Sequence, residues 1–246
     1  MLEILLLVFI TGVLTGFFDS VIGAGGLISV PALIFLGLPP QTAIATDRFG
    51  LLGQSPPALY KFWKAKKIVW KYVPAFSVIS LIASLIGANI LLTVDPGVLE
   101  PIIGITILIL LPLVFLKRNI GLKKIRTTRT KNIIGLTLYF LIMVFGGFFG
   151  QGTGPMVFYS LAFFLGFTML EVTGTGIIPW FILTISSLAI FALNGIIDYK
   201  IGIMLLIGMS IGSYIGAHFV IKKGEKWLKS LFVVFVLVLG LKLILF

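Results

Sequence analysis

The chain has 246 residues, of which 59% are hydrophobic and 11% charged, with a mean hydropathy of +1.19 and a formal net charge of +11. Water-soluble domains are about 45–50% apolar and about 25% charged, so the composition excludes that class and predicts an integral membrane protein. The basic residues lie in short runs between apolar segments, which excludes a nucleic-acid-binding face. Because the chain has no cysteine, disulfides and thiolate sites are excluded as well.

Apolar runs bounded by charged residues, or by Gly and Pro, predict ten membrane segments in chain order. Eight are long enough to cross a hydrocarbon core of about 30 Å. They cover residues 2–22, 41–62, 71–92, 98–116, 132–150, 168–193, 200–221 and 227–246. The other two, 27–38 and 155–166, would each give only about 18 Å of helix, so each predicts a half-helix or re-entrant segment.

Basic residues predict the orientation of these segments. Three stretches, 61–71, 117–131 and 222–229, hold 16 of the 19 Lys and Arg residues. The positive-inside rule therefore places them in the cytoplasm, and it places the turns around Asp95 and 194–200 outside. The chain is therefore predicted to cross the membrane many times.

The chain also contains an internal repeat. When the sequence is shifted by 129 residues, Ser84–Asn89 aligns with Ser213–His218, and both read Ser-x-Ile-Gly-Ala. At the same offset the glycine-rich Gly23–Gly26 aligns with Gly152–Pro155, and with two more residues inserted Gly16–Asp19 aligns with Gly147–Gly150. Further matches at the first offset are Gly37 with Gly166, Thr46 with Thr175, Phe62 with Phe191, Ile68 with Ile197, and Trp70 with Tyr199.

Equivalent loops of the two units fall on opposite sides of the membrane in the charge-based topology, so the units are expected to be inverted. The predicted fold is an all-α integral membrane protein with two inverted-topology repeats of about five segments, each containing a short broken helix. We expect a first repeat over 1–116, a basic cytoplasmic loop over 117–131 and a second repeat over 132–246. This architecture is typical of secondary transporters, whose sites lie between the repeats near the membrane midplane.

Two stretches resemble a known family. Gly16–Arg48 contains Gly-Phe-Phe-Asp, a glycine-rich break, Val-Pro-Ala-Leu, Gly-Leu-Pro-Pro and Ala-Thr-x-Arg in order, and Gly146–Pro155 reads GGFFGQGTGP. In these motifs the chain resembles the sulfite exporter TauE/SafE family of membrane transporters. The resemblance implies export or uptake of small sulfur-containing anions or organic acids without ATP. Gly146, Asp47 and Gly174–Gly176 depart from the family's common Asp, Asn and Asn-Thr-Lys, so the resemblance does not identify the substrate.

The two glycine-rich breaks are the first candidate substrate site. A helix that begins inside the membrane presents unpaired N–H groups and the positive end of its dipole, which suit an anion such as sulfite or a sulfonate. Small residues there would let a ligand approach the backbone, although they also suit close helix packing alone. The candidates are Gly23, Ala24, Gly25, Gly26, Gln151, Gly152, Thr153 and Gly154.

Polar residues inside the predicted helices form the second group of candidates. Arg48 offers a planar donor fork for a sulfonate or carboxylate, or it forms a structural ion pair with Asp19. Asp19 and Asp47 are candidates for proton coupling or ion pairing. Thr46 and Thr175 are equivalent and are expected to contact substrate, with intrahelical hydrogen bonding as the alternative. The dispersed acidic residues and single His predict no metal site, cofactor or catalytic residue.

The sequence thus predicts a secondary transporter that moves a small anion across the cytoplasmic membrane. Its expected partners are that anion and the lipid bilayer, with no nucleic acid, and association of copies into a homo-oligomer is left open. A passive anion channel is one alternative, because channels also contain broken helices. The other is a membrane-embedded enzyme acting on a lipid-linked substrate, for which the chain offers few acidic residues; we therefore predict that it is not an enzyme.

Overall fold

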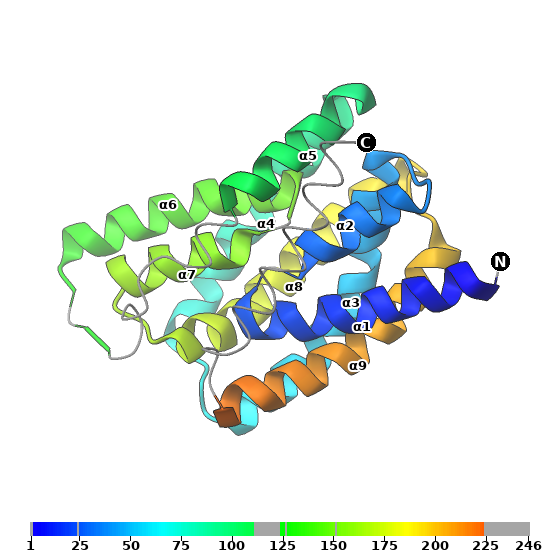
Figure 1. Cartoon of the computed structure of the whole chain (residues 1–246). Helices are drawn as coiled ribbons and strands as arrows, with labels where there is room; N and C mark the ends of the chain where they lie inside the picture. Colours follow the sequence, from blue (N-terminus) through cyan, green and yellow to red (C-terminus); the bar gives the residue numbers. More distant parts are fainter. Residues whose placement is uncertain (1, 24, 111–123, 126, 151, 224–246) are drawn as a thin grey trace.

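The computed structural model describes residues 2–23, 25–110, 124–125, 127–150 and 152–223, and all regular structure within them is helical (Figure 1). The α-helices are α1 Leu2–Ile22, α2 Gly26–Phe35, α3 Pro40–Lys64, α4 Val73–Thr93, α5 Pro96–Leu110, α6 Arg129–Phe148, α7 Thr153–Phe164, α8 Met169–Leu193 and α9 Tyr199–Lys223. A 3-10 turn covers Trp70–Tyr72. Nine of the ten predicted segments coincide with these helices, and the tenth, 227–246, lies outside the described residues.

Within the described part of the chain, five helices are long and apolar enough to cross a membrane: α1, α4, α6, α8 and α9. α3 is as long as α8, at 25 residues, but it is much less apolar. It carries Asp47, Arg48 and Gln54, all of which are buried. A charged side chain facing lipid is strongly unfavourable, so α3 is stable only because the bundle encloses it.

The two undersized segments are helices that start beside a glycine-rich break. α2 has 10 residues and begins after Gly25, and α7 has 12 residues and begins after Gly152, whose φ is +75°. A left-handed φ is readily adopted by glycine, and it lets the chain turn sharply before the helix starts. The expectation of two short helices is therefore confirmed in the structure.

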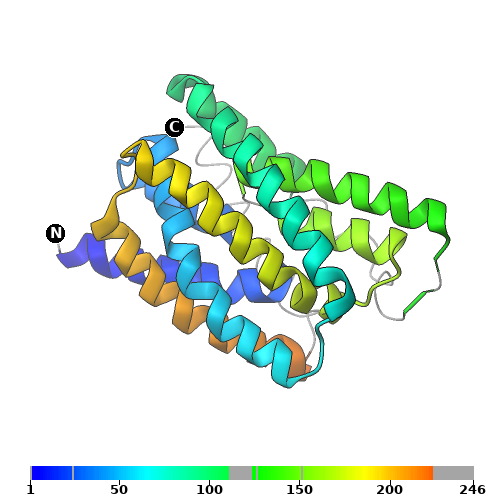
Figure 2. The ribbon, with the colours of Figure 1, turned by 180° about the vertical axis from the view of Figure 1, so that it is seen from behind.

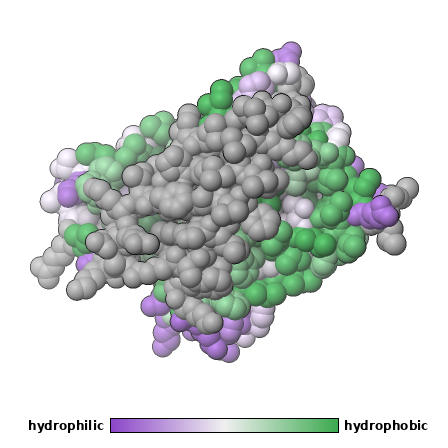
Figure 3. Space-filling view, in the orientation of Figure 1, coloured by the Kyte–Doolittle hydropathy of each residue, from purple (hydrophilic) through white to green (hydrophobic). Residues whose placement is uncertain are grey.

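Large hydrophobic side chains cover the outside of the bundle, as lipid contact requires. Leu6 on α1, Leu141 on α6 and Val78 on α4 are each more than half exposed. Figure 3 shows this hydrophobic surface where the described residues are visible, with hydrophilic residues gathered toward the ends of the helices. Such an apolar surface on a bundle of long helices indicates a multi-pass membrane protein.

The long helices pack side by side in the order α6, α4, α8, α3, α9, α1, each against the next (Figures 1 and 2). The short α2 packs on α1 and α3, and the short α7 packs on α6 and α8. α3 and α8 are thus the central pair. The ends of α1 and α6, where the chain breaks, are brought toward this pair by the short helices.

The described residues of the basic stretches gather at one end of the bundle. Lys61 and Lys64 at the end of α3 line a surface pocket together with His218 and Lys222 of α9. At the start of α8, Glu171 forms an ion pair of 3.0 Å with Lys124 of the basic loop. This clustering agrees with the predicted cytoplasmic end, because the positive-inside rule collects basic residues on that side.

Glycines spaced four residues apart allow α1 and α9 to touch along their length. They are Gly12 and Gly16 on α1, and Gly208, Gly212 and Gly216 on α9. A Cβ at any of them would collide with backbone atoms of the other helix, and the contacts advance in the same direction along both helices, so the two run parallel. Small-xxx-small spacing is how membrane helices approach closely without a hydrophobic driving force.

We predict that Gly212→Ala destabilises the folded protein by about 1–3 kcal/mol, because the added methyl collides with the backbone at Val13. The matched control is Gly176→Ala on α8, where an added Cβ meets nothing within 4 Å. Thermal unfolding in detergent measures both. A Gly212→Ala variant at least as stable as Gly176→Ala would contradict the tight α1–α9 contact.

Candidate functional site

The two glycine-rich breaks meet in the middle of the bundle. The Gly154 N–H at the start of α7 donates a hydrogen bond of 3.0 Å to the Gly23 carbonyl that follows α1. A Cβ on either glycine would collide with the backbone of the other. The glycines thus have a packing role, which the sequence left as the alternative, and this contact also places both breaks beside the same cavity.

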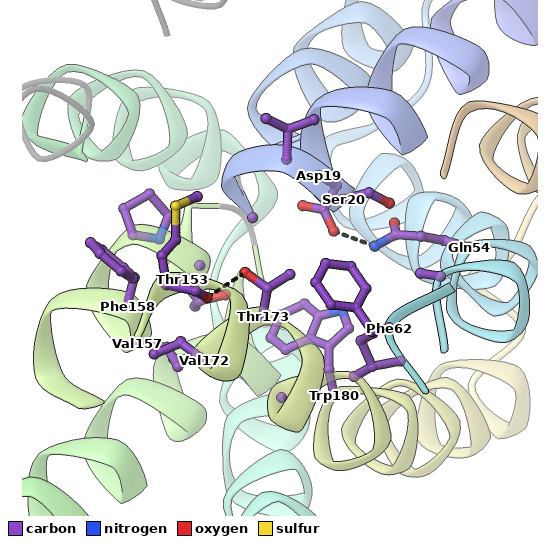
Figure 4. A pocket seen from close by; sticks show the side chains of 18 of the residues that line it. Asp19, Ser20, Gln54, Phe62, Thr153, Val157, Phe158, Val172, Thr173 and Trp180 are labelled. Atoms are coloured by element: carbon purple, nitrogen blue, oxygen red, sulfur yellow. Dashed lines mark hydrogen bonds between the residues drawn. The ribbon is translucent and has the colours of Figure 1, made fainter. Parts of the chain in front are cut away.

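A cavity of about 130 Å³ lies where the breaks meet (Figure 4). Its wall is formed by the end of α1, the second half of α3, α6, the start of α7 and the first half of α8. Aromatic and aliphatic side chains make most of the lining, with a few polar groups among them. The polar residues are Asp19, Ser20, Gln54, Thr153 and Thr173, and the large aromatic ones are Phe62, Tyr139, Phe158, Tyr159 and Trp180.

Asp19 is partly exposed to this cavity and is held by two donors. The Gly25 N–H donates to Oδ1 at 3.0 Å, and the Gln54 Nε2 amide donates to Oδ2. The Asp19 carboxylate therefore sits at the break that precedes α2 and accepts one of the N–H groups that the sequence assigned to substrate. This contact helps to hold α1, α2 and α3 together.

The ion pair between Asp19 and Arg48 was one of the two alternatives predicted for Arg48. That prediction is wrong, since no ion pair joins these two residues in the described structure. Arg48 is completely buried, and its Nη2 donates to the Gly146 carbonyl at 2.7 Å. The physical reason is separation along α3, because Arg48 is nearly two helical turns before Gln54, the residue that reaches Asp19.

Arg48 keeps donors that no described residue uses. Its Nε and Nη1 are buried and have no hydrogen-bond partner among the described residues. The guanidinium packs against Gly150, whose φ is +85°, and its Cζ lies 5.6 Å from the centre of the Trp180 ring. Arg48 is not part of the cavity wall, but Trp180 is, so Trp180 contacts both the cation and the cavity.

Thr46, Thr175 and Asp47 lie outside the cavity and make contacts within the protein. Thr46 Oγ1 accepts from the Asp198 N–H at 3.0 Å, and Thr175 Oγ1 accepts from the Val69 N–H at 2.9 Å. Asp47 accepts from the Ser29 hydroxyl of α2. The fold thus uses these side chains to hold loops and helices, and their contact with substrate stays a prediction.

The remaining candidates divide between the cavity wall and its surroundings. Gly23, Thr153 and Gly154 line the cavity, and the Thr153 hydroxyl donates to the Gly150 carbonyl at 2.8 Å. Gly25, Gly26 and Gly152 are buried next to it. Ala24 and Gln151 lie outside the described residues.

Several residues that line the cavity were not predicted as site residues from the sequence, among them Ser20, Tyr139, Phe158 and Trp180. One signal for Trp180 was present, because most tryptophans of membrane proteins lie near the ends of helices whereas Trp180 lies in the middle of α8. Tyr139 and Phe158 look like ordinary apolar helix residues in the sequence. Only the packing of α6 and α7 assigns them to the cavity.

The ends of two helices give the cavity an electrical asymmetry. The last turn of α1 carries the Asp19 carboxylate at one side of the cavity, whereas the first turn of α7 contributes Thr153 and Gly154 to the wall, with the Gly154 N–H bonded to the Gly23 carbonyl. The macrodipole makes the first end negative and the second positive. An anion is therefore best placed toward α7, and a cation toward α1.

Comparison with known proteins gives a family for this arrangement. The family model "Sulfite exporter TauE/SafE" matches residues 8–243. A probable membrane transporter protein, ORF9, of Sinorhizobium sp is 29% identical over 98% of this chain and 93% of its own length. A probable membrane transporter protein of Haemophilus influenzae is 24% identical over 99% of this chain and 95% of its own length. The probable membrane transporter protein YfcA of Escherichia coli K12 is 28% identical over 96% of this chain and 88% of its own length. No solved structure matches the chain.

We predict that Asp19→Asn and Arg48→Gln act independently on stability. Their free-energy changes should add to within about 0.5 kcal/mol in the double variant, because the side chains share no contact. As a control, Ser29→Ala and Asp47→Asn, which touch directly, should show a coupling of about 0.5–3 kcal/mol. Thermal or denaturant unfolding of the single and double variants measures both coupling energies. A strong coupling between Asp19 and Arg48 would contradict the prediction and support an ion pair between them.

Proposed function

The chain belongs to the sulfite exporter TauE/SafE family of membrane transporters, and on this premise we propose that it is a secondary transporter of a small anion. The substrate class is sulfite, an organosulfonate or a related organic acid, carried across the cytoplasmic membrane. The observation that carries the proposal is the cavity at the meeting point of the two helix breaks. Transporter sites are expected where interrupted helices of two repeats meet near the membrane midplane.

The packing order of the helices supports the two inverted repeats, 1–116 and 132–246, joined by the loop 117–131. The repeat makes α1 equivalent to α6, α3 to α8 and α4 to α9. When each helix in the order α6, α4, α8, α3, α9, α1 is replaced by its equivalent, the result is α1, α9, α3, α8, α4, α6. This is the same order reversed. A pseudo-two-fold axis between α3 and α8 produces this relation.

Reciprocal hydrogen bonds give a second support. Thr46 and Thr175 are equivalent, and so are Val69 and Asp198 at the same offset. Thr175 binds the Val69 N–H and Thr46 binds the Asp198 N–H, so each repeat holds the loop of the other in the same way. These contacts join the early part of each central helix to the loop that follows the other, so α3 and α8 run antiparallel, as inverted units require.

The donors around the cavity suit an anion with oxygen atoms. The start of α7 supplies the positive end of a helix dipole, and Trp180 Nε1 is a buried donor with no partner among the described residues. Arg48 supplies the only full positive charge in the described contacts of Trp180. Rotation of the Trp180 side chain would open Arg48 to the cavity, which is the type of local gating that alternating access uses.

We predict saturable counterflow of radiolabelled sulfite in proteoliposomes, and its loss when the cavity is filled. Gly176 of α8 lines the cavity, and its added Cβ meets nothing within 4 Å, so Gly176→Leu should slow exchange at least about tenfold while the protein stays folded. Gly176→Ala is the matched control and should keep most of the rate. Full activity in the leucine variant would exclude this cavity as the substrate route, and unsaturable flux would favour a channel.

We predict that Lys64 and Asn194 face opposite sides of the membrane. Both are exposed, the first at the end of α3 and the second after α8. Because the chain has no cysteine, single Lys64→Cys and Asn194→Cys variants can be labelled with a membrane-impermeant maleimide from either side of oriented vesicles. Labelling of both from the same side would refute the inverted arrangement.

A further inference from the structure

Oxygen-bearing side chains from two helices converge at the α1 end of the cavity. Asp19 and Ser20 belong to the last turn of α1, and Gln54 reaches them from α3 (Figure 4). The chain turns at Gly23, whose φ is +68°, shortly after these residues, so the C-terminal end of α1 lies at this end of the cavity. The negative end of the α1 dipole thus coincides with the carboxylate.

The hydrogen bonds of this group leave oxygen atoms available. Both carboxylate oxygens of Asp19 accept a hydrogen bond, one from the Gly25 N–H at 3.0 Å and one from Gln54 Nε2, so the carboxylate is held in one orientation. Gln54 Oε1 and Ser20 Oγ are buried, with relative exposures of 7% and 3% for these residues, and have no hydrogen-bond partner among the described residues. Buried oxygens without a partner are unfavourable unless a ligand or an ordered water molecule uses them.

No described positive charge neutralises Asp19. Arg48, the nearest cation along α3, binds the Gly146 carbonyl instead. No other titratable or charged group on the elements around Asp19 makes a hydrogen bond or ion pair with it in the described structure. These groups are Glu3 of α1, Asp47, Tyr60, Lys61 and Lys64 of α3, Arg129, Lys131 and Tyr139 of α6, Tyr159 of α7, Glu171 of α8, and Tyr199, Lys200, Tyr214, His218 and Lys222 of α9.

We propose that Asp19, Ser20 and Gln54 bind an alkali-metal cation that enters together with the transported anion. Hard cations take oxygen ligands, and a single carboxylate with neutral amide, hydroxyl and carbonyl oxygens balances one positive charge but not two. The ends of interrupted membrane helices are where sodium is held in secondary transporters. The sequence predicts no metal site because its acidic residues are dispersed and it has a single His. An alkali cation does not need clustered carboxylates or histidines.

This inference rests on the proposed function, and it also solves a problem of that function. An anion in a cavity of about 130 Å³ would lie close to the Asp19 carboxylate. Like charges at short range in a low-dielectric site repel strongly. A cation between the carboxylate and the anion converts this repulsion into attraction, so binding of the two ions becomes cooperative.

The first test measures cation binding without any substrate. The melting temperature of the purified chain is followed as NaCl replaces choline chloride at constant ionic strength, with KCl and LiCl in parallel. A ligand that binds only the folded form raises its stability, so sodium should raise Tm by several degrees. Equal Tm values in all four salts would overturn the proposal.

Variants assign the effect to the site. Asp19→Asn should abolish the rise in Tm, and Ser20→Ala should weaken sodium binding at least tenfold. The matched controls are Asp95→Asn, an exposed acid at the start of α5, and Ser187→Ala, a buried serine of α8 that is not among the cavity-lining residues and bonds to the Leu183 carbonyl. Controls that lose the sodium response as completely as the site variants would overturn the assignment.

The second test separates this inference from the proposed function. Sulfite binding is measured by calorimetry with and without sodium, at pH 6 and pH 8. Binding that sodium strengthens at least tenfold at both pH values supports the proposal. Binding that does not respond to sodium at either pH would overturn it and leave anion transport intact. A sodium-dependent Tm without sulfite binding would refute sulfite as the substrate and leave the cation site standing.

Discussion

The contact between Gly23 and Gly154 is the constraint on which the rest of the site depends. Two backbones touch there, one N–H bonds to one carbonyl, and a side chain on either residue would separate them. Both helix breaks are therefore brought to one point, with the end of α1 facing the start of α7. The short helices that leave this point then run beside α3 and α8, and the cavity is the space that the two breaks and the two central helices enclose.

The membrane explains why polar groups gather at this point. Lipid cannot satisfy a broken helix end or a buried charge, so such groups are stable only inside the bundle. The central helices carry them: Arg48 binds the Gly146 carbonyl, Gln54 binds Asp19, Thr46 binds the loop after α8, and Thr175 binds the loop after α3. Glycine contacts such as those between α1 and α9 let the surrounding helices close tightly around this polar centre.

Separation of charge along the cavity connects this structure to transport. The α1 end is negative through Asp19 and the helix dipole, the α7 end is positive through its own dipole, and Arg48 lies against the Trp180 ring. A cation at the first end and an anion at the second would each find the opposite charge. In the proposed mechanism an anion is accommodated better when the cation site is filled, which is the physical basis proposed for moving both together.

The sequence by itself determined the membrane class and the positions of nine helices, including the two short ones, because length, apolar runs and glycine breaks are local properties. The offset of 129 residues also predicted which helices are equivalent, although their inverted arrangement stays a proposal. Only the tertiary structure decided that Asp19 binds Gln54 rather than Arg48, and that Trp180 and Tyr139 line the cavity. These contacts join residues on different helices, such as Thr46 and Asp198, which are 152 positions apart. Their geometry depends on how helices rotate and cross, and a list of apolar segments contains no information about that.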